Sequence, residues 1–280
     1  MTAPHSFHPE MILVPSSLTR AVALLALAST IAGAQGADST RSQPTPLVSG
    51  RDAVFAGVVV LGSAAVSTID RRVAVSLRSP RWQDREALDD IAHGAKLVNE
   101  RSLFAAGVAT YLVGRVGRME RLADVSFHAT EAIVISSVVG TGIRGTLGRT
   151  RPFVTAGRDP YDFHPGKGFS ELQYRAFPSI HASASMATAV VIAHETGRWW
   201  PRSHKVVAPL LYTAALTPGL ARMYASKHWA SDVVAGVALG AWTGAKVVRY
   251  HHGRKHNRLD RWFLGAGEQG GVSLAWRGSF

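Results

Sequence analysis

Six apolar stretches, separated by polar or basic segments, are the feature that most restricts how this chain folds. Each is long enough for a helix, and the alternating polarity of half-buried strands is rare before the last residues. The sequence therefore predicts an all-α domain, a six-helix bundle within residues 51–250. The stretches cover residues 53–69, 103–117, 125–143, 182–194, 206–220 and 233–248.

The two ends of the chain lie outside this bundle. Arg20 precedes an apolar run of signal-peptide length, and residues 32–34, AGA, have the small-x-small form of a cleavage site. We therefore expect a signal peptide or leader over 1–34, a polar linker over 35–50 and a basic C-terminal extension over 251–280. The last ten residues of that extension alternate like a strand.

The sequence leaves open whether the bundle crosses a membrane. Most of the stretches are shorter or more polar than a typical span, and the mean hydropathy of +0.07 is low for a polytopic protein. Basic segments after the second, fourth and sixth stretches nevertheless match the positive-inside rule. If the leader is cleaved, the chain that follows starts outside, and crossing three spans would put the end of the third stretch in the cytoplasm. This conflicts with six spans and an outward-facing site. A secreted domain whose apolar stretches are buried core helices is the simpler explanation. We expect an exported protein of the cell envelope, periplasmic or membrane-associated, with its site facing away from the cytoplasm.

Composition narrows the chemistry. The net charge of +12 attracts nucleic acid, anionic lipid and phosphorylated molecules alike, but no nucleic-acid-binding signature accompanies it. No cysteine is present, so a thiolate nucleophile and a cysteine-based zinc site are excluded. No carboxylate cluster suits Mg²⁺. His251 and His252 have no complementary ligands nearby in the sequence, so no metal site is expected there.

Two short blocks offer groups that bind anions. Residues 144–152, RGTLGRTRP, place three arginines among glycines and present several guanidinium groups to one anion. Residues 177–184, FPSIHASA, open the fourth stretch, where free N–H groups and the helix dipole attract anions. His181 in this first turn is placed to give a proton to a leaving oxygen. Ordinary helix capping would also explain the Pro-Ser pair.

A third block lies ahead of the sixth stretch, in residues 221–232, ARMYASKHWASD. His228 and Asp232 are four apart, so on a helix they share a face and Asp232 can accept a hydrogen bond from one imidazole nitrogen. That bond would fix the tautomer and leave the other nitrogen as a nucleophile. Alone, such a pair is more often a surface contact.

The three blocks together, R-x6-R-P, P-S-x-H and R-x5-H-x3-D in this order, resemble the signature of the type-2 phosphatidic acid phosphatase and vanadium haloperoxidase superfamily. The resemblance covers about 125–250. It implies the helical architecture of that superfamily and a phosphatase that needs no metal or cofactor. Vanadate or phosphate would occupy the pocket as an inhibitor. The substrate implied is a lipid phosphate such as phosphatidate or a polyprenyl diphosphate.

The resemblance also implies a role for each matching residue. His228 attacks phosphorus and forms a phosphohistidine, Asp232 orients it, and His181 protonates the leaving group and then activates water. Such a protein mainly positions the phosphoryl group and neutralises its charge. The groups that hold the phosphoryl oxygens are Arg144, Arg151, Ser179, Ile180 and Arg222.

Three residues depart from the family pattern, which usually has Lys at Arg144, Gly at Ile180 and Ser at Ala221. Isoleucine is the largest departure, because a β-branched residue does not readily take positive φ and adds bulk to the pocket. We expect an active enzyme. The alternatives are a soluble non-specific acid phosphatase and a degenerate member that binds phosphate or lipid head groups without turnover.

Overall fold

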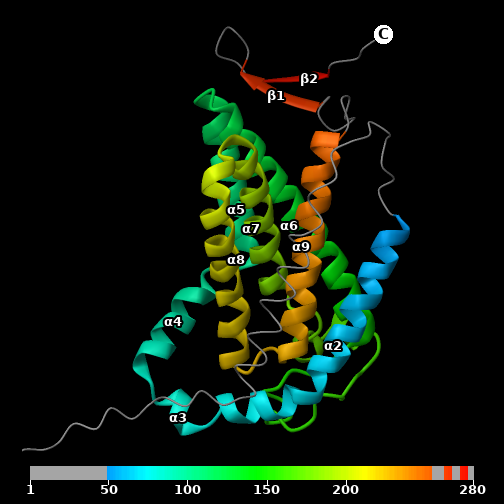
Figure 1. The fold of residues 1–280 in the computed structure, drawn as a ribbon. Coiled ribbons are helices and arrows are strands. Elements are labelled where there is room, and N and C mark those ends of the chain that lie inside the picture. Colours follow the sequence, from blue (N-terminus) through cyan, green and yellow to red (C-terminus); the bar gives the residue numbers. More distant parts are fainter. Residues whose placement is uncertain (1–48, 254–261, 267–271, 277–280) are drawn as a thin grey trace, which may run out of the picture.

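The computed structural model describes residues 49–253 and two strands beyond them, residues 262–266 and 272–276. Six long helices dominate the described part of the chain, and each coincides with one of the six apolar stretches, so the predicted bundle is confirmed (Figure 1). The long helices are α2 (Gly50–Leu77), α5 (Glu100–Val116), α6 (Glu120–Leu147), α7 (Ile180–Trp199), α8 (Pro201–Tyr224) and α9 (Ala230–Gly253).

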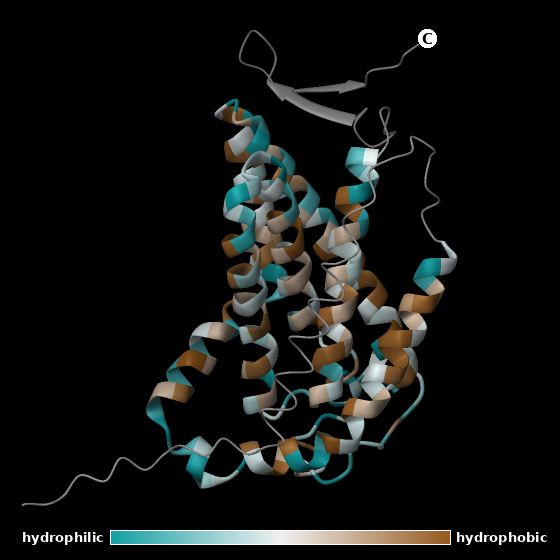
Figure 2. Cartoon of the chain, in the orientation of Figure 1, coloured by the Kyte–Doolittle hydropathy of each residue, from teal (hydrophilic) through white to brown (hydrophobic). Residues whose placement is uncertain are grey.

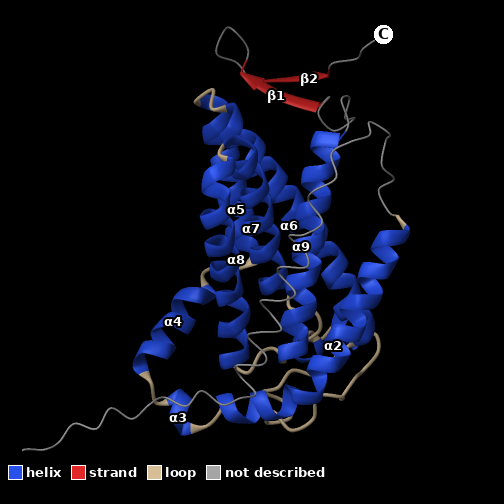
Figure 3. Ribbon diagram, in the orientation of Figure 1, coloured by secondary structure: helices blue, strands red, loops and turns tan. Residues whose placement is uncertain are grey.

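Shorter elements connect them. Helices α3 (Pro80–Gln83) and α4 (Glu86–Lys96) lie between α2 and α5. The long loop from α6 to α7 holds two 3-10 turns, η2 (Lys167–Phe169) and η3 (Leu172–Tyr174). This loop gathers with the α8–α9 connection at one end of the bundle (Figure 3).

Helices α7 and α9 form the centre of the bundle, and most of their residues are buried. They approach closely because glycines recur on the face of α9 that meets α7. A Cβ atom at Gly236 would collide with the carbonyl oxygen of Ser179, and one at Gly240 with that of Ser183. The α9 glycines therefore hold the start of α9 against the start of α7, where the second and third sequence blocks lie.

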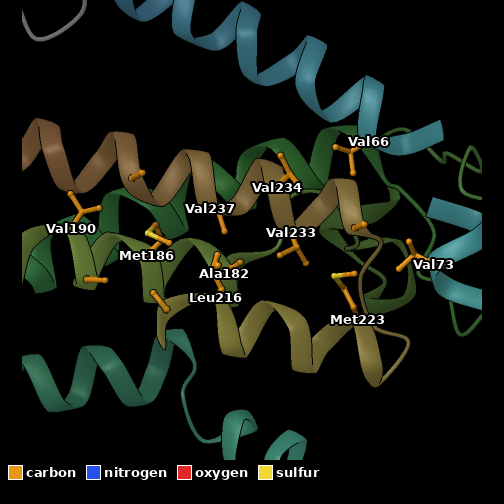
Figure 4. Close-up of a cluster of buried hydrophobic side chains, with 14 of the residues drawn as sticks. Val66, Val73, Ala182, Met186, Val190, Leu216, Met223, Val233, Val234 and Val237 are labelled. Atoms are coloured by element: carbon orange, nitrogen blue, oxygen red, sulfur yellow. The ribbon is translucent and has the colours of Figure 1, made fainter. Parts of the chain in front are cut away.

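The main hydrophobic core lies between α2, α7, α8 and α9 (Figure 4). Val66 and Val73 of α2 enter it from one side and Leu216 of α8 from the other, around Met186 of α7 and Val233 of α9. Burying side chains of this size stabilises the fold by about 1.5–3 kcal/mol each. The core ties the outer helix α2 to the central pair.

The outer helices keep large apolar side chains on the surface. Val54, Val58 and Leu61 of α2 are at least half exposed, and Figure 2 shows the apolar residues along this helix. Only 11% of its most apolar window is buried, so the alternative in which every apolar stretch is a core helix fails for α2. By length and composition α2, α6 and α8 are able to cross a membrane. This surface supports membrane association.

The C-terminal strands β1 (Trp262–Ala266) and β2 (Val272–Trp276) pair antiparallel, with Trp262 opposite Trp276. The strand predicted from the alternating C-terminal residues therefore corresponds to β2. The predicted leader over residues 1–34 lies outside the described residues, as does nearly all of the predicted linker.

Candidate active site

The three sequence blocks meet at one end of the bundle, where α6 and α8 end and α7 and α9 begin (Figure 1). Arg144 lies in the last turn of α6 and Arg222 in the last turn of α8. Ser179 is the N-cap of α7, and Asp232 lies in the first turn of α9. The backbone N–H of Ser179 donates to the carbonyl oxygen of Asp232 at 2.9 Å, which joins the second block to the third.

His228 is held by a backbone carbonyl. Its Nδ1 lies 2.7 Å from the oxygen of Ala176 but 3.6 Å from Oδ2 of Asp232, beyond hydrogen-bond range. The carbonyl of Ala176 therefore takes the place of Asp232 in the hydrogen bond predicted for His228. Helical spacing does not apply to His228, because it precedes the start of α9 at Ala230. A carbonyl oxygen only accepts, so Nδ1 carries the proton and Nε2 keeps its lone pair.

Asp232 is instead bound to Arg149. The guanidinium of Arg149 donates to Oδ1 of Asp232 at 2.6 Å and to Oδ2 of Asp70 at 2.8 Å. Oδ2 of Asp232 accepts from the backbone N–H of Trp229 at 2.7 Å. Asp70, from α2, also accepts from the backbone N–H of Ser231 at 2.9 Å. One buried arginine thus bridges two buried carboxylates.

This network corrects one part of the sequence interpretation. The first block suggested three arginines for one anion, but protein groups occupy the guanidinium of Arg149. Gly148 makes the inward turn possible, because its φ is +61° and a Cβ there would collide with the carbonyl oxygen of His164. Asp70 was missed. Its only sequence signal is an isolated carboxylate at the end of an apolar stretch.

Three other arginines retain unused donors. The Nε atoms of Arg144, Arg151 and Arg222 are buried and have no hydrogen-bond partner within the described part of the chain. Nor does any of the three form a salt bridge with a described carboxylate. A buried donor without a partner costs about 1–3 kcal/mol. A bound anion would satisfy all three and gain charge-assisted hydrogen bonds.

The same arginines act on the two histidines. Burial lowers the pKa of His228 well below its usual value, and the charges of Arg151, Arg144 and Arg222 lower it further. Burial also lowers the pKa of His181 to about 4, assisted by Arg222. His228 is therefore neutral at physiological pH, the state a nucleophile requires.

His181 has a partner that the sequence did not reveal. Its Nδ1 lies 3.4 Å from Oε2 of Glu100, the first residue of α5. The carboxylate opposes the arginines and offsets part of the lowering of the His181 pKa. The side chain of Asn99 caps this helix by accepting from the backbone N–H groups of Arg101 and Ser102, which fixes the position of Glu100. Glu100 belongs to none of the three blocks, so no spacing marks it.

Glu100→Gln is expected to move the alkaline limb of the kcat profile to lower pH by about one unit, because it removes a negative charge that favours protonated His181. Activity should fall several-fold more at pH 8 than at pH 5. Glu86→Gln, at an exposed glutamate of α4, is the matched control. An equal loss of activity at every pH would assign Glu100 a purely structural role.

Ile180 does not enter the pocket in the way its bulk suggested. It is the first residue of α7, is only 3% exposed and is not among the described residues with positive φ. A Cβ built on Gly140 of α6 would lie 3.3 Å from Cγ1 of Ile180 and 3.5 Å from Cδ2 of Leu239. The isoleucine side chain therefore packs between helices, where Gly140 leaves room.

Ile180→Gly is expected to destabilise the protein by about 2–5 kcal/mol, as large-to-small core substitutions do, while kcat stays within a few-fold. Thermal unfolding and phosphate release, measured on the same preparations, test both parts. A tenfold gain in kcat without loss of stability would show instead that isoleucine obstructs the pocket.

Ala221 also has a packing role. It is buried and clusters with Ala92 and Ala95 of α4, with Tyr224 packed against them. The small side chain lets α4 approach the end of α8. The alanine that stands where the family usually has serine therefore lies in a contact between helices.

The fold and the site together define an all-α bundle with a site suited to anion binding at one end. Two histidines and three arginines with unused donors form that site. Residues 126–256 match the family model of the PAP2 superfamily. The family resemblance predicted from the three blocks is thus confirmed.

Two relatives share parts of this region. The chain is 36% identical over 83 residues to a decaprenylphosphoryl-5-phosphoribose phosphatase of Mycobacterium tuberculosis, over 30% of this chain and 41% of the relative. It is 29% identical over 144 residues to a lipid A 1-phosphatase of Rhizobium johnstonii, over 50% of this chain and 55% of the relative. The chain thus matches about half or less of the length of these relatives. No solved structure matches it significantly.

Proposed function

We propose that this protein is a membrane-associated, metal-independent phosphatase that hydrolyses a phosphomonoester or diphosphate of a lipid through a phosphohistidine on His228. The observation that carries the proposal is a set of three buried arginines whose Nε–H groups have no acceptor among the described residues and whose charges act on His228 and His181. Their charge and donors suit a phosphoryl group.

The reaction proceeds in two steps. Nε2 of His228 attacks phosphorus while the bond to the leaving oxygen breaks, and His181 gives that oxygen its proton. A bound phosphoryl anion offsets the arginine charges and so favours the protonated form of His181 that this step needs. His181 then takes a proton from water, which attacks the phosphohistidine and releases inorganic phosphate. The arginines and the N–H groups at the start of α7 neutralise the phosphoryl oxygens, and Asp232 stabilises the positive charge that develops on His228.

A lipid substrate fits both the surface and the relatives. The two relatives are named for a decaprenylphosphoryl and a lipid A substrate. The arginines and histidines of the site lie at an end of the bundle, where a lipid head group would lie if the apolar outer helices were in a bilayer. Members of the family usually need no metal, so we expect the protein to be active in the presence of a chelator.

The distribution of charge supports an orientation. The turns between α5 and α6 and between α7 and α8 lie at the end opposite the pocket, and both are basic. By the positive-inside rule this end faces the cytoplasm, so the pocket faces away from it. The basic residues in question are Arg115, Arg118, Arg121, Arg198, Arg202 and Lys205.

The test is phosphate release by the purified full chain in detergent, with EDTA present. The panel contains phosphatidate, a polyprenyl diphosphate, p-nitrophenyl phosphate and a sugar phosphate. We expect kcat/KM for a lipid phosphate to exceed that for the soluble compounds by at least about tenfold, roughly 1.4 kcal/mol of transition-state binding. A preference for soluble substrates would overturn the lipid assignment. Phosphate binding without phosphate release from any compound would support the alternative of a degenerate member that binds phosphate without turnover.

A further inference from the structure

A second cluster of titratable side chains lies at the opposite end of the bundle from the pocket. His128 of α6, Glu195 of α7 and His252 of α9 converge there. Oε1 of Glu195 lies 2.7 Å from Nδ1 of His128 and 2.7 Å from Nε2 of His252. The expectation that His252 has no complementary ligands is therefore wrong, because the fold brings them from two other helices.

The cluster is partly enclosed and its members are supported. Glu195 is 1% exposed and His128 6%, whereas His252 remains open to solvent. The ring of His251 stacks on that of His128 at 4.1 Å and is itself held by Glu131, 2.6 Å away. Such outer contacts orient the imidazole, as they do around protein metal ions.

Asp124 is a candidate for a fourth ligand. Asp124 precedes His128 by one turn of α6, so the two share a helix face. Its carboxylate interacts electrostatically with His128, Glu195 and His252. Two imidazoles and two carboxylates are an N/O ligand set that suits zinc.

We propose that His128, Glu195 and His252, with Asp124 completing the shell, bind one Zn²⁺ ion that ties α6, α7 and α9 together. The three donor atoms already lie within 4.8 Å of one another. Tetrahedral zinc with bonds of 2.0–2.1 Å separates its ligands by about 3.3 Å, so small side-chain rotations open the present hydrogen-bonded cluster to the ion.

The ion serves structure and not the phosphatase reaction. Arg144 of the pocket lies sixteen residues beyond His128 on the same helix, about 24 Å at 1.5 Å per residue. The ion binds between helices that also pack through small apolar side chains, among them Ala129 of α6, Val191 of α7 and Val248 of α9. The site stands independently of the proposed phosphatase function.

The test uses the full chain without an affinity tag, stripped with EDTA and dialysed in detergent. Zn²⁺ at about 100 times its Kd should raise Tm by at least about 5 °C, with one ion bound per chain. His252→Ala should abolish this rise. His93→Ala, which removes an exposed histidine paired with Asp89 on α4, is the matched control and should keep it.

A second measurement covers the case in which His252→Ala fails to fold. Co²⁺ in place of zinc should give the intense visible bands of tetrahedral cobalt in the wild type and in His93→Ala. Their absence from the wild type, or the lack of a Tm rise with Zn²⁺, would overturn the site. So would an equal Tm rise in wild type and His252→Ala.

Discussion

Replacing His228 with glutamine is expected to lower phosphate release by at least about 10³-fold, because the variant lacks the nucleophilic Nε2. The glutamine amide retains a donor for the carbonyl oxygen of Ala176, which holds Nδ1 in the wild type at 2.7 Å. The arginines remain, so KM should change only a few-fold. The loss should therefore fall on kcat.

The matched control is His164→Gln, at a partly exposed histidine of the α6–α7 loop. It should keep nearly wild-type kcat, and both variants should unfold close to the wild-type temperature. Undiminished release by the His228 variant would remove the basis for a phosphohistidine mechanism. A rise in KM with unchanged kcat would make His228 a binding residue only.

Arg149→Ala is expected to destabilise the protein by about 3–5 kcal/mol, since it leaves the buried carboxylates of Asp70 and Asp232 without their counter-ion. Phosphate release should also be lost, although Arg149 has no donor left for substrate. Arg149 joins Asp70 of α2 to the start of α9, so its removal frees the segment that carries His228. Thermal unfolding in detergent and phosphate release are the measurements.

A double variant separates the charge effect from lost packing. Adding Asp70→Asn to Arg149→Ala removes one of the two uncompensated charges and should recover about 1 kcal/mol or more of the loss. Arg158→Ala, at an exposed arginine of the same loop, should leave stability unchanged. Wild-type stability in Arg149→Ala would show that the bridge between the two carboxylates contributes nothing.

The sequence predicted the parts of the molecule that depend on local pattern. The helices follow from apolar stretches of sufficient length, and the arginines and histidines of the pocket follow from short spacings within three blocks. Asp70 and Glu100 were out of reach, because they arrive from α2 and α5 by tertiary packing alone. Likewise, the carbonyl of Ala176 reaches His228 through the path of a long loop, which no periodicity specifies.

The expectations that Ile180 adds bulk to the pocket and that His252 lacks complementary ligands were wrong for a related reason. Each expectation considered only the residues that are near in the sequence. The side chain of Ile180 fits because Gly140 leaves space on another helix, and His252 meets Glu195 from fifty-seven positions away. Pairings between helices decide both cases.

Trapping the phosphorylated intermediate is the decisive test of a phosphohistidine on His228. The full chain is mixed with a lipid phosphate labelled in the phosphoryl group, quenched in alkali, which preserves phosphohistidine, and mapped by peptide mass. We predict one acid-labile phosphoryl group per chain, on His228, absent from His228→Gln and longer-lived in His181→Gln. Label on another residue, or label that persists in His228→Gln while phosphate is released, would contradict this prediction.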